Sequence, residues 1–197
     1  MYLIFDCSSV AKPQNYKEPY TNSFHWPRMV HLSFIVLGED LKPIEDFDCI
    51  IKPEGYKITP AVEKLCVLEP EDFKTKAADL ASVLEQFELS AKKCQYLFAH
   101  NLAYNENTLA AEYMRKNMSP DFMRLEKFCL MQEGTFFCKL PNKRGGYKWP
   151  TLNELHARCF KQQYSPGRNA RADVVAAARC FIYMMKKGEL EDLFDED

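Results

Sequence analysis

Apolar residues recur along the chain in two patterns, one typical of strands and one typical of helices. Residues 2–5 (YLIF) form a short apolar run that stops at Asp6, which predicts a buried central strand ending in a carboxylate. Residues 30–37 (VHLSFIVL) place an apolar side chain at every second position, as a half-buried strand does. Residues 47–51 (FDCII) are predicted to be its hairpin partner across the GEDLKP turn.

Helical spacing dominates the rest of the chain. Apolar residues three and four positions apart, strong helix formers and a Pro at a first turn predict helices over residues 60–65, 77–90, 106–116, 149–160 and 170–187. Thr151 followed three residues later by Glu154 is a capping box, which marks a helix start. Residues 95–100 (QYLFAH) are expected to be another buried strand. Early strands followed by helices and further strands indicate a mixed α/β fold.

Length and composition favour one globular domain. The chain has 197 residues, of which 47% are hydrophobic and 27% are charged. No apolar run approaches the roughly 18 residues that a membrane helix needs. The N-terminus, MYLIFDCSS, lacks the features of a signal peptide. We therefore expect a cytoplasmic protein with no membrane partner.

Charge is distributed unevenly between the body and the end of the chain. The formal net charge is −2, but the last nine residues, ELEDLFDED, carry six acids and no base. Residues 1–188 hold 26 bases and 22 acids, a net charge of +4, which permits polyanion binding without requiring it. We expect one domain over residues 1–188 and a solvated acidic tail over residues 189–197.

The eight cysteines do not indicate a metal site. None form a C-x-x-C pair, and most lie among apolar residues, as Cys180 does in AARCFIYMM. Zinc sites usually need clustered ligands at short spacings. Reduced and mostly buried thiols are expected instead.

Four segments attract a functional interpretation. They are Asp6 at the end of the first strand, residues 100–112 (HNLAYNENTLAAE), residues 168–173 (RNARAD) and the basic and aromatic loop of residues 139–149 (KLPNKRGGYKW). From the residues alone the first three are only suggestive, because an acid at a strand end can face an acid on a neighbouring helix. An isolated surface aspartate is otherwise most often a solvated side chain.

Three ordered blocks resemble the DEDDh 3′–5′ exonucleases, the DnaQ-like proofreading type of DNA polymerase III epsilon. FDCSS at residues 5–9 resembles the family's F-D-x-E-T, and AHNLAYNENTLAAEYMR at residues 99–115 resembles its H-N-x-x-F-D block. RNARADVVAAARCF at residues 168–181 is similar to H-N-A-x-x-D-V-x-A-T-A-R-C-F. The linking segments are also similar in order and spacing. The resemblance implies an RNase H-like α/β fold, a mixed β-sheet flanked by α-helices.

The resemblance also implies a chemistry, which this sequence keeps only in part. In the family four carboxylates hold two Mg²⁺ ions about 4 Å apart, and a histidine takes a proton from the attacking water. The first and last acids are retained as Asp6 and Asp173, which would be the remaining metal ligands. The family's Glu, middle Asp and His positions hold Ser8, Asn105 and Arg168.

Charge at these positions argues against hydrolysis. Two acids and one guanidinium leave a net −1 where two dications would need four negative charges, and an arginine cannot act as a base. Glu106 is a potential substitute ligand, but neighbouring helix residues point about 100° apart, so it should project away from the site. We hypothesise that Arg168 bridges Asp6 and Asp173 in place of the metals. Laboratory replacement of a single Asp would not account for all three substitutions.

One linking segment departs from the family as well. The family's I-H-G-I/V turn, which lines the substrate groove, corresponds to Leu65, Cys66, Val67 and Leu68. These substitutions remove a polar side chain and a permissive backbone position.

The loop at residues 139–149 is a second candidate nucleic-acid contact. Its basic residues could follow a phosphate backbone while Tyr147 and Trp149 stack on bases. These basic residues are Lys139, Lys143, Arg144 and Lys148. The alternative is a glycine-turned hairpin with solvated lysines and with Trp149 packed in the core. Phe136 and Phe137 are expected to be core residues.

We therefore expect an exonuclease-like protein that is catalytically inactive and is retained for binding single-stranded DNA or RNA at a 3′ end, or for docking to a protein. Two alternatives stay open: an active metal-dependent 3′–5′ exonuclease with atypical ligands, and a protein-interaction module without nucleic-acid affinity. No cofactor is expected, and Mg²⁺ or Mn²⁺ would be needed only if hydrolysis remains.

Overall fold

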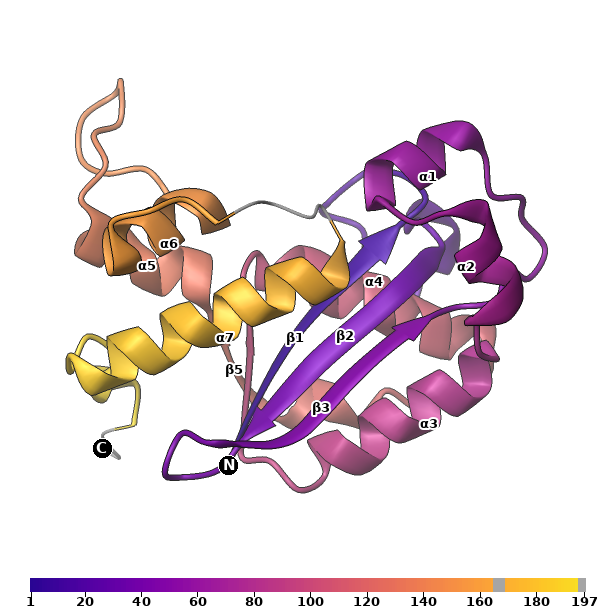
Figure 1. The fold of residues 1–197 in the computed structure, drawn as a ribbon, viewed down its shortest axis with the longest axis horizontal. Coiled ribbons are helices and arrows are strands. Elements are labelled where there is room, and N and C mark those ends of the chain that lie inside the picture. The colour runs from indigo at the N-terminus through magenta and orange to yellow at the C-terminus, as the bar shows by residue number, and fades with distance from the viewer. Residues whose placement is uncertain (165–168, 195–197) are drawn as a thin grey trace.

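The computed structural model describes residues 1–164 and 169–194, apart from the side chain of Leu65. Five strands form one sheet in the order β3-β2-β1-β4-β5. The strands are β1 (Tyr2–Ser9), β2 (Met29–Leu37), β3 (Pro43–Ile50), β4 (Tyr96–Ala99) and β5 (Glu126–Cys129). β2 is antiparallel to both β1 and β3, whereas β4 is parallel to both β1 and β5. The predicted mixed α/β fold is confirmed (Figure 1).

Seven α-helices and three short 3-10 helices accompany the sheet in the described part of the chain. The α-helices are α1 (Pro60–Cys66), α2 (Pro70–Thr75), α3 (Leu80–Ala91), α4 (Leu102–Arg115), α5 (Leu130–Cys138), α6 (Leu152–Phe160) and α7 (Ala170–Lys186). The 3-10 helices are η1 (Ser23–His25), η2 (Asp121–Arg124) and η3 (Glu191–Leu193). The capping box at the start of α6 is confirmed, with Thr151 and Glu154 each accepting from the other's backbone N–H.

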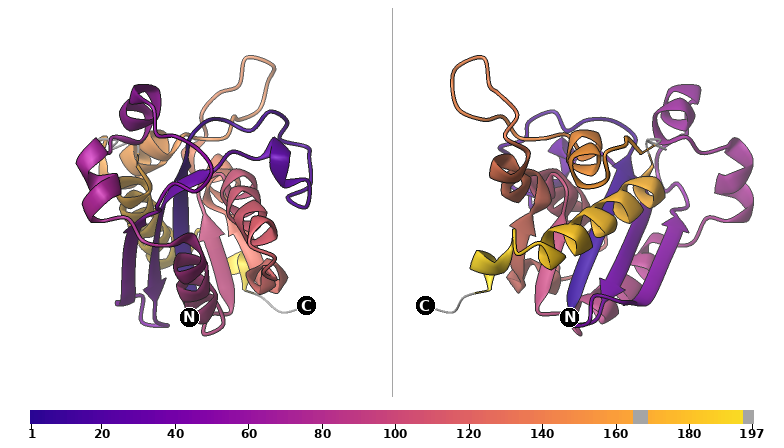
Figure 2. Two further views of the ribbon diagram at one scale, coloured as in Figure 1. Left: turned by 90° about the vertical axis from the view of Figure 1, so that its right-hand side faces the viewer. Right: turned by 60° about the vertical axis from the view of Figure 1, so that its left-hand side comes forward.

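Side chains of β1 alternate between two apolar layers, so that β1 forms the centre of the molecule. Leu3 and Phe5 pack against α3 and α4, while Ile4 faces α7. Figure 2 shows α7 lying across β1 and β2 on one face of the sheet. The central position predicted for this strand is confirmed.

Several predicted boundaries need correction. β1 does not stop at Asp6 but continues to Ser9, because Asp6, Cys7 and Ser8 keep their register with β2. The partner strand begins at Pro43 and not at residue 47. The third helix of the prediction, residues 106–116, begins four residues early, because Asn101 adopts a left-handed conformation (φ 60°) that Asn tolerates and turns the chain directly into α4.

Residues 190–194 of the acidic segment pack against the body of the protein. Leu190 is buried, and the Phe194 ring packs against Tyr96 with ring centroids 5.0 Å apart. The Phe194 ring also packs against the Tyr2 ring, with ring centroids 5.8 Å apart. Apolar side chains between the acids therefore anchor residues 190–194 to the edge of the apolar layer, while Glu191 and Asp192 remain exposed. The expectation of a solvated segment is wrong for these residues.

Candidate functional site

A cleft of about 450 Å³ opens where the end of β1 meets the start of α4. Asp6 and Ser8 come from β1, Asn105 from α4 and Asp173 from α7. The structure therefore brings four of the five residues at the resemblance-derived positions to one cleft. Arg168, the fifth, lies outside the described residues.

Asn105 uses its whole side-chain amide within this cleft. Its Nδ2 donates to Oδ1 of Asp6 at 3.0 Å and to the backbone oxygen of His100 at 2.9 Å. Its Oδ1 accepts from the backbone N–H of Cys7 at 3.0 Å, and the Cys7 thiol lies 3.3 Å from the same oxygen. The side chain is only 1% exposed, so these bonds replace all its contact with water.

Two backbone groups fix which way this amide points. The Cys7 N–H can only donate and the His100 carbonyl can only accept, so the oxygen of Asn105 must face Cys7 and its nitrogen must face His100. The nitrogen is thereby also aimed at Asp6. An Asp in this position would have no hydrogen to offer to either acceptor and would place two carboxylates side by side.

The two retained acids are held in an environment that disfavours their charge. Burial raises the pKa of Asp6 well above its ordinary value, and the neighbouring Asp173 raises it further, whereas the Asn105 hydrogen bond lowers it. Burial also raises the pKa of Asp173, against a lowering by Tyr164, whose hydroxyl donates to Oδ1 of Asp173 at 2.7 Å. Uncharged donors, and not cations, are thus the described groups that meet these two carboxylates.

Glu106 does not replace the missing carboxylate. It projects from the next position of α4 and forms an ion pair with Lys127 of β5, with Oε2 and Nζ 2.9 Å apart. The prediction that Glu106 points away from Asp6 is confirmed.

The turn after α1 carries a backbone conformation that its residue does not favour. Val67, in the place of the family's Gly, has φ 52° and ψ 48°, the left-handed region. A β-branched residue is strained there. Cys66, in the place of the family's His, is buried at the cleft with its thiol donating to the backbone oxygen of Ser9 at 3.6 Å. Val67 therefore holds a backbone conformation that glycine adopts more easily.

His100 links the cleft to the segment before α6. One ring nitrogen, Nε2, lies 3.0 Å from the backbone oxygen of Pro150, which requires that nitrogen to carry the hydrogen. Burial lowers the pKa of His100 to about 4, although the Pro150 contact opposes this. The ring is therefore neutral near pH 7.

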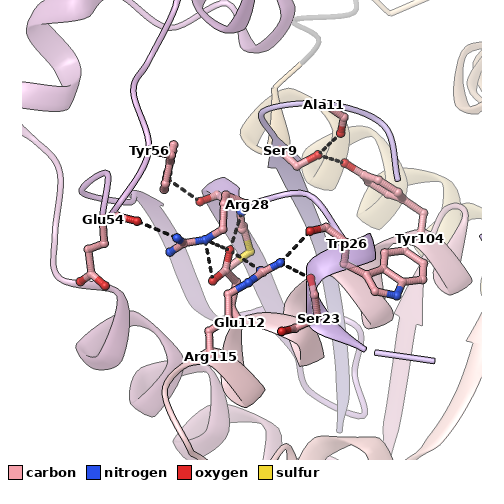
Figure 3. Close-up of polar contacts among 11 residues, drawn as sticks. Ser9, Ala11, Ser23, Trp26, Arg28, Glu54, Tyr56, Tyr104, Glu112 and Arg115 are labelled. Carbon is pink, nitrogen blue, oxygen red and sulfur yellow. Dashed lines mark hydrogen bonds and ion pairs between the residues drawn. The ribbon is translucent and has the colours of Figure 1, made fainter. Parts of the chain in front are cut away.

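The segment of residues 10–28 forms one wall of the cleft, to which it contributes Lys12 and Tyr16. It is fixed by Glu112, a fully buried acid on α4 that meets Nε of Arg28 at 3.0 Å and Nη1 of Arg115 at 2.9 Å (Figure 3). Arg115 also donates to the backbone oxygen of Trp26 at 2.6 Å. This network was not predicted from the sequence, because Arg28 lies 84 residues before Glu112.

The loop of residues 139–149 stands out from the body between α5 and α6 (Figure 1). Lys143, Arg144 and Tyr147 are exposed, whereas Lys148 is bound by both carboxylate oxygens of Glu154 at 2.7 Å. Trp149 is 57% exposed and not packed in the core. Phe136 was expected to be a core residue and is instead 74% exposed, since its helix α5 turns this face toward the loop. Phe137 is partly buried against α6 and α7, as expected.

Comparison with known proteins gives a likeness of fold. No family model matches the sequence, and no curated protein matches it. Among solved structures, E. coli Exonuclease I in complex with a dT13 oligonucleotide superposes with a TM-score of 0.72 and 15% identity, over 98% of this chain and 42% of that chain. The fold is RNase H-like. The complex of the same enzyme with dA16 superposes with a TM-score of 0.67 and 15% identity, over 98% of this chain and 45% of that chain. A zinc-bound form of its complex with single-stranded DNA superposes with a TM-score of 0.68 and 15% identity, over 98% of this chain and 45% of that chain.

This likeness confirms the predicted RNase H-like exonuclease fold, with a five-stranded mixed sheet and flanking helices. The chain spans less than half the length of the Exonuclease I chains it matches. In the part of the chain that the structure describes, no helix is long and apolar enough to cross a membrane.

The donor groups of the cleft do not fit a pair of divalent ions. Mg²⁺ and Mn²⁺ bind oxygens, preferably carboxylates. The described residues supply two carboxylates here, and the amide nitrogen of Asn105 points at one of them. No cluster of three or more His, Cys, Asp or Glu suited to a metal exists among residues 1–164 and 169–194.

Proposed function

We propose that this chain is an exonuclease-like protein that binds single-stranded nucleic acid in the cleft and does not hydrolyse it. One observation carries the proposal: Asn105 donates hydrogen bonds to Asp6 and to the His100 carbonyl from the place of the family's middle carboxylate. A hydrogen-bond donor stands where the family's reaction needs a metal ligand. Among the described residues, Asp6 and Asp173 each meet a neutral donor, from Asn105 and Tyr164.

The absence of a base adds to this argument. In the family a histidine accepts the proton of the attacking water, and Arg168 stands at that position. An arginine keeps its proton at any physiological pH. We expect its guanidinium to meet Asp6 and Asp173 or a phosphate of the bound strand. A carboxylate accepts several hydrogen bonds, so the donors Asn105 and Tyr164 leave both kinds of partner open to the guanidinium.

Binding of a strand has separate support. The Exonuclease I structures with this fold are complexes with oligonucleotides, dT13 and dA16. In this chain the cleft wall contains a basic side chain, Lys12, and an exposed aromatic ring, Tyr16. Such a pair suits a phosphate backbone and a stacked base. Lys143, Arg144 and Tyr147 would extend the contact beyond the cleft.

The test is an exonuclease assay on 5′-labelled single-stranded DNA and RNA with Mg²⁺ or Mn²⁺. The native chain is compared with the triple variant Ser8→Glu, Asn105→Asp, Arg168→His, which restores the family's residue types. We expect no shortening of either substrate by the native chain and measurable shortening by the triple variant. The matched control adds Asp6→Ala to the triple variant, which should abolish any gained activity.

Two results would replace this proposal. Robust turnover by the native chain, lost in Asp6→Ala, would establish an active nuclease with unusual ligands. A native chain that neither hydrolyses nor binds oligonucleotides at low salt would favour the remaining hypothesis, a protein-interaction module without nucleic-acid affinity. Binding must weaken as salt rises, because phosphate contacts release counterions.

A further inference from the structure

The loop of residues 139–149 is a shaped arm. α5 ends at Lys139, whose left-handed backbone (φ 51°) turns the chain away from the body. Pro141 and Tyr147 then pair as an antiparallel bridge, and Gly145 and Gly146 reverse the chain with φ of 92° and 70°. Left-handed conformations at both positions are easy only for glycine. We call residues 139–149 the arm.

Three large aromatic side chains are exposed on or beside the arm. Phe136 is 74% exposed, Trp149 57% and Tyr147 44%. The rings of Phe136 and Tyr147 meet edge to face, with centroids 6.1 Å apart and planes at 89°. Tyr147 and Trp149 are two residues apart at the end of the arm. Rings of this size are usually buried, and several together indicate a binding surface.

All the charged residues of the arm are basic. Its sequence has no acid, and Lys139, Lys143 and Arg144 are exposed with no carboxylate partner among the described residues. Lys148 is excluded from this set because Glu154 neutralises it. The charge therefore favours a polyanion as the partner over an apolar or basic protein surface.

The base of the arm adjoins the cleft. His100, which lines the cleft, holds the backbone oxygen of Pro150 directly after Trp149. Leu152, two residues further on, lines the cleft as well. A strand leaving the cleft on this side therefore meets the exposed rings next.

We infer that the arm is a stacking platform for the bases of a single strand, with Phe136, Tyr147 and Trp149 as the rings and Lys139, Lys143 and Arg144 as phosphate contacts. This inference rests on the proposed binding of nucleic acid in the cleft. It adds a second contact that requires unpaired bases, because paired bases cannot lie on protein rings.

The chain contains its own reporter for this contact. It has two tryptophans, and Trp26 is 3% exposed with its indole nitrogen donating to the backbone oxygen of Glu18 at 3.1 Å. A ligand that quenches tryptophan fluorescence by stacking should therefore act on Trp149. The Trp149→Phe variant keeps a ring for stacking but retains only the buried reporter.

The experiment titrates the full chain with oligo-dT of about 20 nucleotides, with the same length of abasic strand, and with oligo-dT of about 5 nucleotides. We expect oligo-dT to quench the native chain and not Trp149→Phe. The long abasic strand should bind more weakly. Phe136→Ala with Tyr147→Ala should weaken binding of the long oligo-dT roughly tenfold and leave the short one unchanged.

A charge pair supplies the matched control. Lys143→Ala with Arg144→Ala should reduce the steepness of log affinity against log salt by about 1.4 for the long strand, or about 0.7 for each lost phosphate contact. Lys92→Ala with Lys93→Ala removes two exposed charges at the end of α3, far from the arm in Figure 1, and should leave the slope unchanged. Circular dichroism of each variant verifies that it is folded.

The outcomes separate this inference from the proposed function. Binding of oligo-dT without quenching of Trp149, and with native affinity in the Phe136 and Tyr147 variant, would overturn the stacking role of the arm. Binding of the strand in the cleft would then remain as the proposed function. Equal affinity for abasic and oligo-dT strands would overturn stacking specifically. If the native chain binds no oligonucleotide, both proposals fail and the arm belongs to a protein interaction.

Discussion

The Asn105 amide donates to the Asp6 carboxylate, with Nδ2 and Oδ1 3.0 Å apart, where α4 packs on the central strand β1. This bond joins α4 to β1 across 99 residues of sequence. The Asn105 side chain is neutral and presents the positive end of its amide dipole to the Asp6 carboxylate. A cation in that place would need acceptors around it, whereas Asn105 presents hydrogen atoms. This bond supports the stability of the cleft, and the proposed loss of metal binding rests on the same contact.

Asn105→Asp should destabilise the protein when no metal is present. The substitution removes two donors, leaves the His100 oxygen without its partner and sets a second carboxylate against Asp6. We expect the free energy of unfolding to fall by about 2 kcal/mol, the usual range for a lost buried hydrogen bond with an unpaired group. Urea denaturation in the presence of EDTA measures this change.

Asn107→Asp is the matched control on the same helix. Asn107 donates only to the backbone oxygen of Ala103, and it is less buried than Asn105. It should lose less than half as much stability. Addition of Mn²⁺ should recover part of the loss in Asn105→Asp and nothing in the native chain, because a ligand that binds only the folded state stabilises it. Equal stability of Asn105→Asp and the native chain in EDTA would contradict the bridge.

His100 should give the folded state a defined pH dependence. Its pKa is lowered by burial to about 4 from an ordinary value of 6.5, so the unfolded chain binds a proton at higher pH than the folded chain does. Stability from this group is therefore complete above pH 6.5 and is lost as the pH falls toward 4. The loss amounts to about 3 kcal/mol by the relation between pKa and free energy.

His100→Gln isolates that contribution. Glutamine keeps an N–H for the Pro150 oxygen but has no proton to gain. The native chain should lose about 3 kcal/mol more than the variant between pH 7 and pH 4, measured by urea denaturation at each pH. Asp6, whose raised pKa acts in the opposite sense, is present in both proteins and cancels. Parallel pH profiles would show that the ring titrates freely.

Much of the fold follows from local patterns in the sequence. β2 and α6 were predicted almost to the residue, since an alternating apolar run and a capping box are local signals. β5 and α5 were not predicted, because residues 126–138 mix apolar and polar positions without a clear period. Their faces are defined only by the elements that pack against them.

The structure brings four of the predicted positions to one cleft, but their hydrogen-bond partners could not be predicted from the sequence. Motif spacing identified Asp6, Asn105 and Asp173, but the sequence does not say which donor each oxygen meets. Tyr164 lies outside the matched blocks, and its bond to Asp173 depends on how α6 and α7 are connected in space. The sequence likewise left open whether Trp149 is exposed or packed in the core, because burial depends on the surrounding surface and not on residue type alone.

The Glu112 network should be the most sensitive part of the cleft wall. Glu112 is fully buried between Arg28 and Arg115 and also accepts the backbone N–H of Met29 at 2.8 Å. Glu112→Gln leaves two guanidinium groups without their counter-charge, which we expect to cost about 3 kcal/mol. Glu71→Gln, in an exposed pair with Lys74, should change stability by less than about 1 kcal/mol. Similar small effects in both variants, measured by urea denaturation, would contradict the structural role of the network.

Val67→Gly should stabilise the chain, in contrast to the other substitutions. Val67 holds a left-handed backbone at the end of α1, and it is 56% exposed, so its side chain gives up little buried contact when removed. Relief of the left-handed strain is worth about 1–2 kcal/mol, and the greater freedom of glycine in the unfolded chain offsets part of it. We expect a net gain of about 1 kcal/mol, seen as a higher urea midpoint at unchanged slope. Val67→Ala keeps a Cβ and should gain less. A loss of stability in Val67→Gly would mean that the valine side chain makes contacts that outweigh its strain.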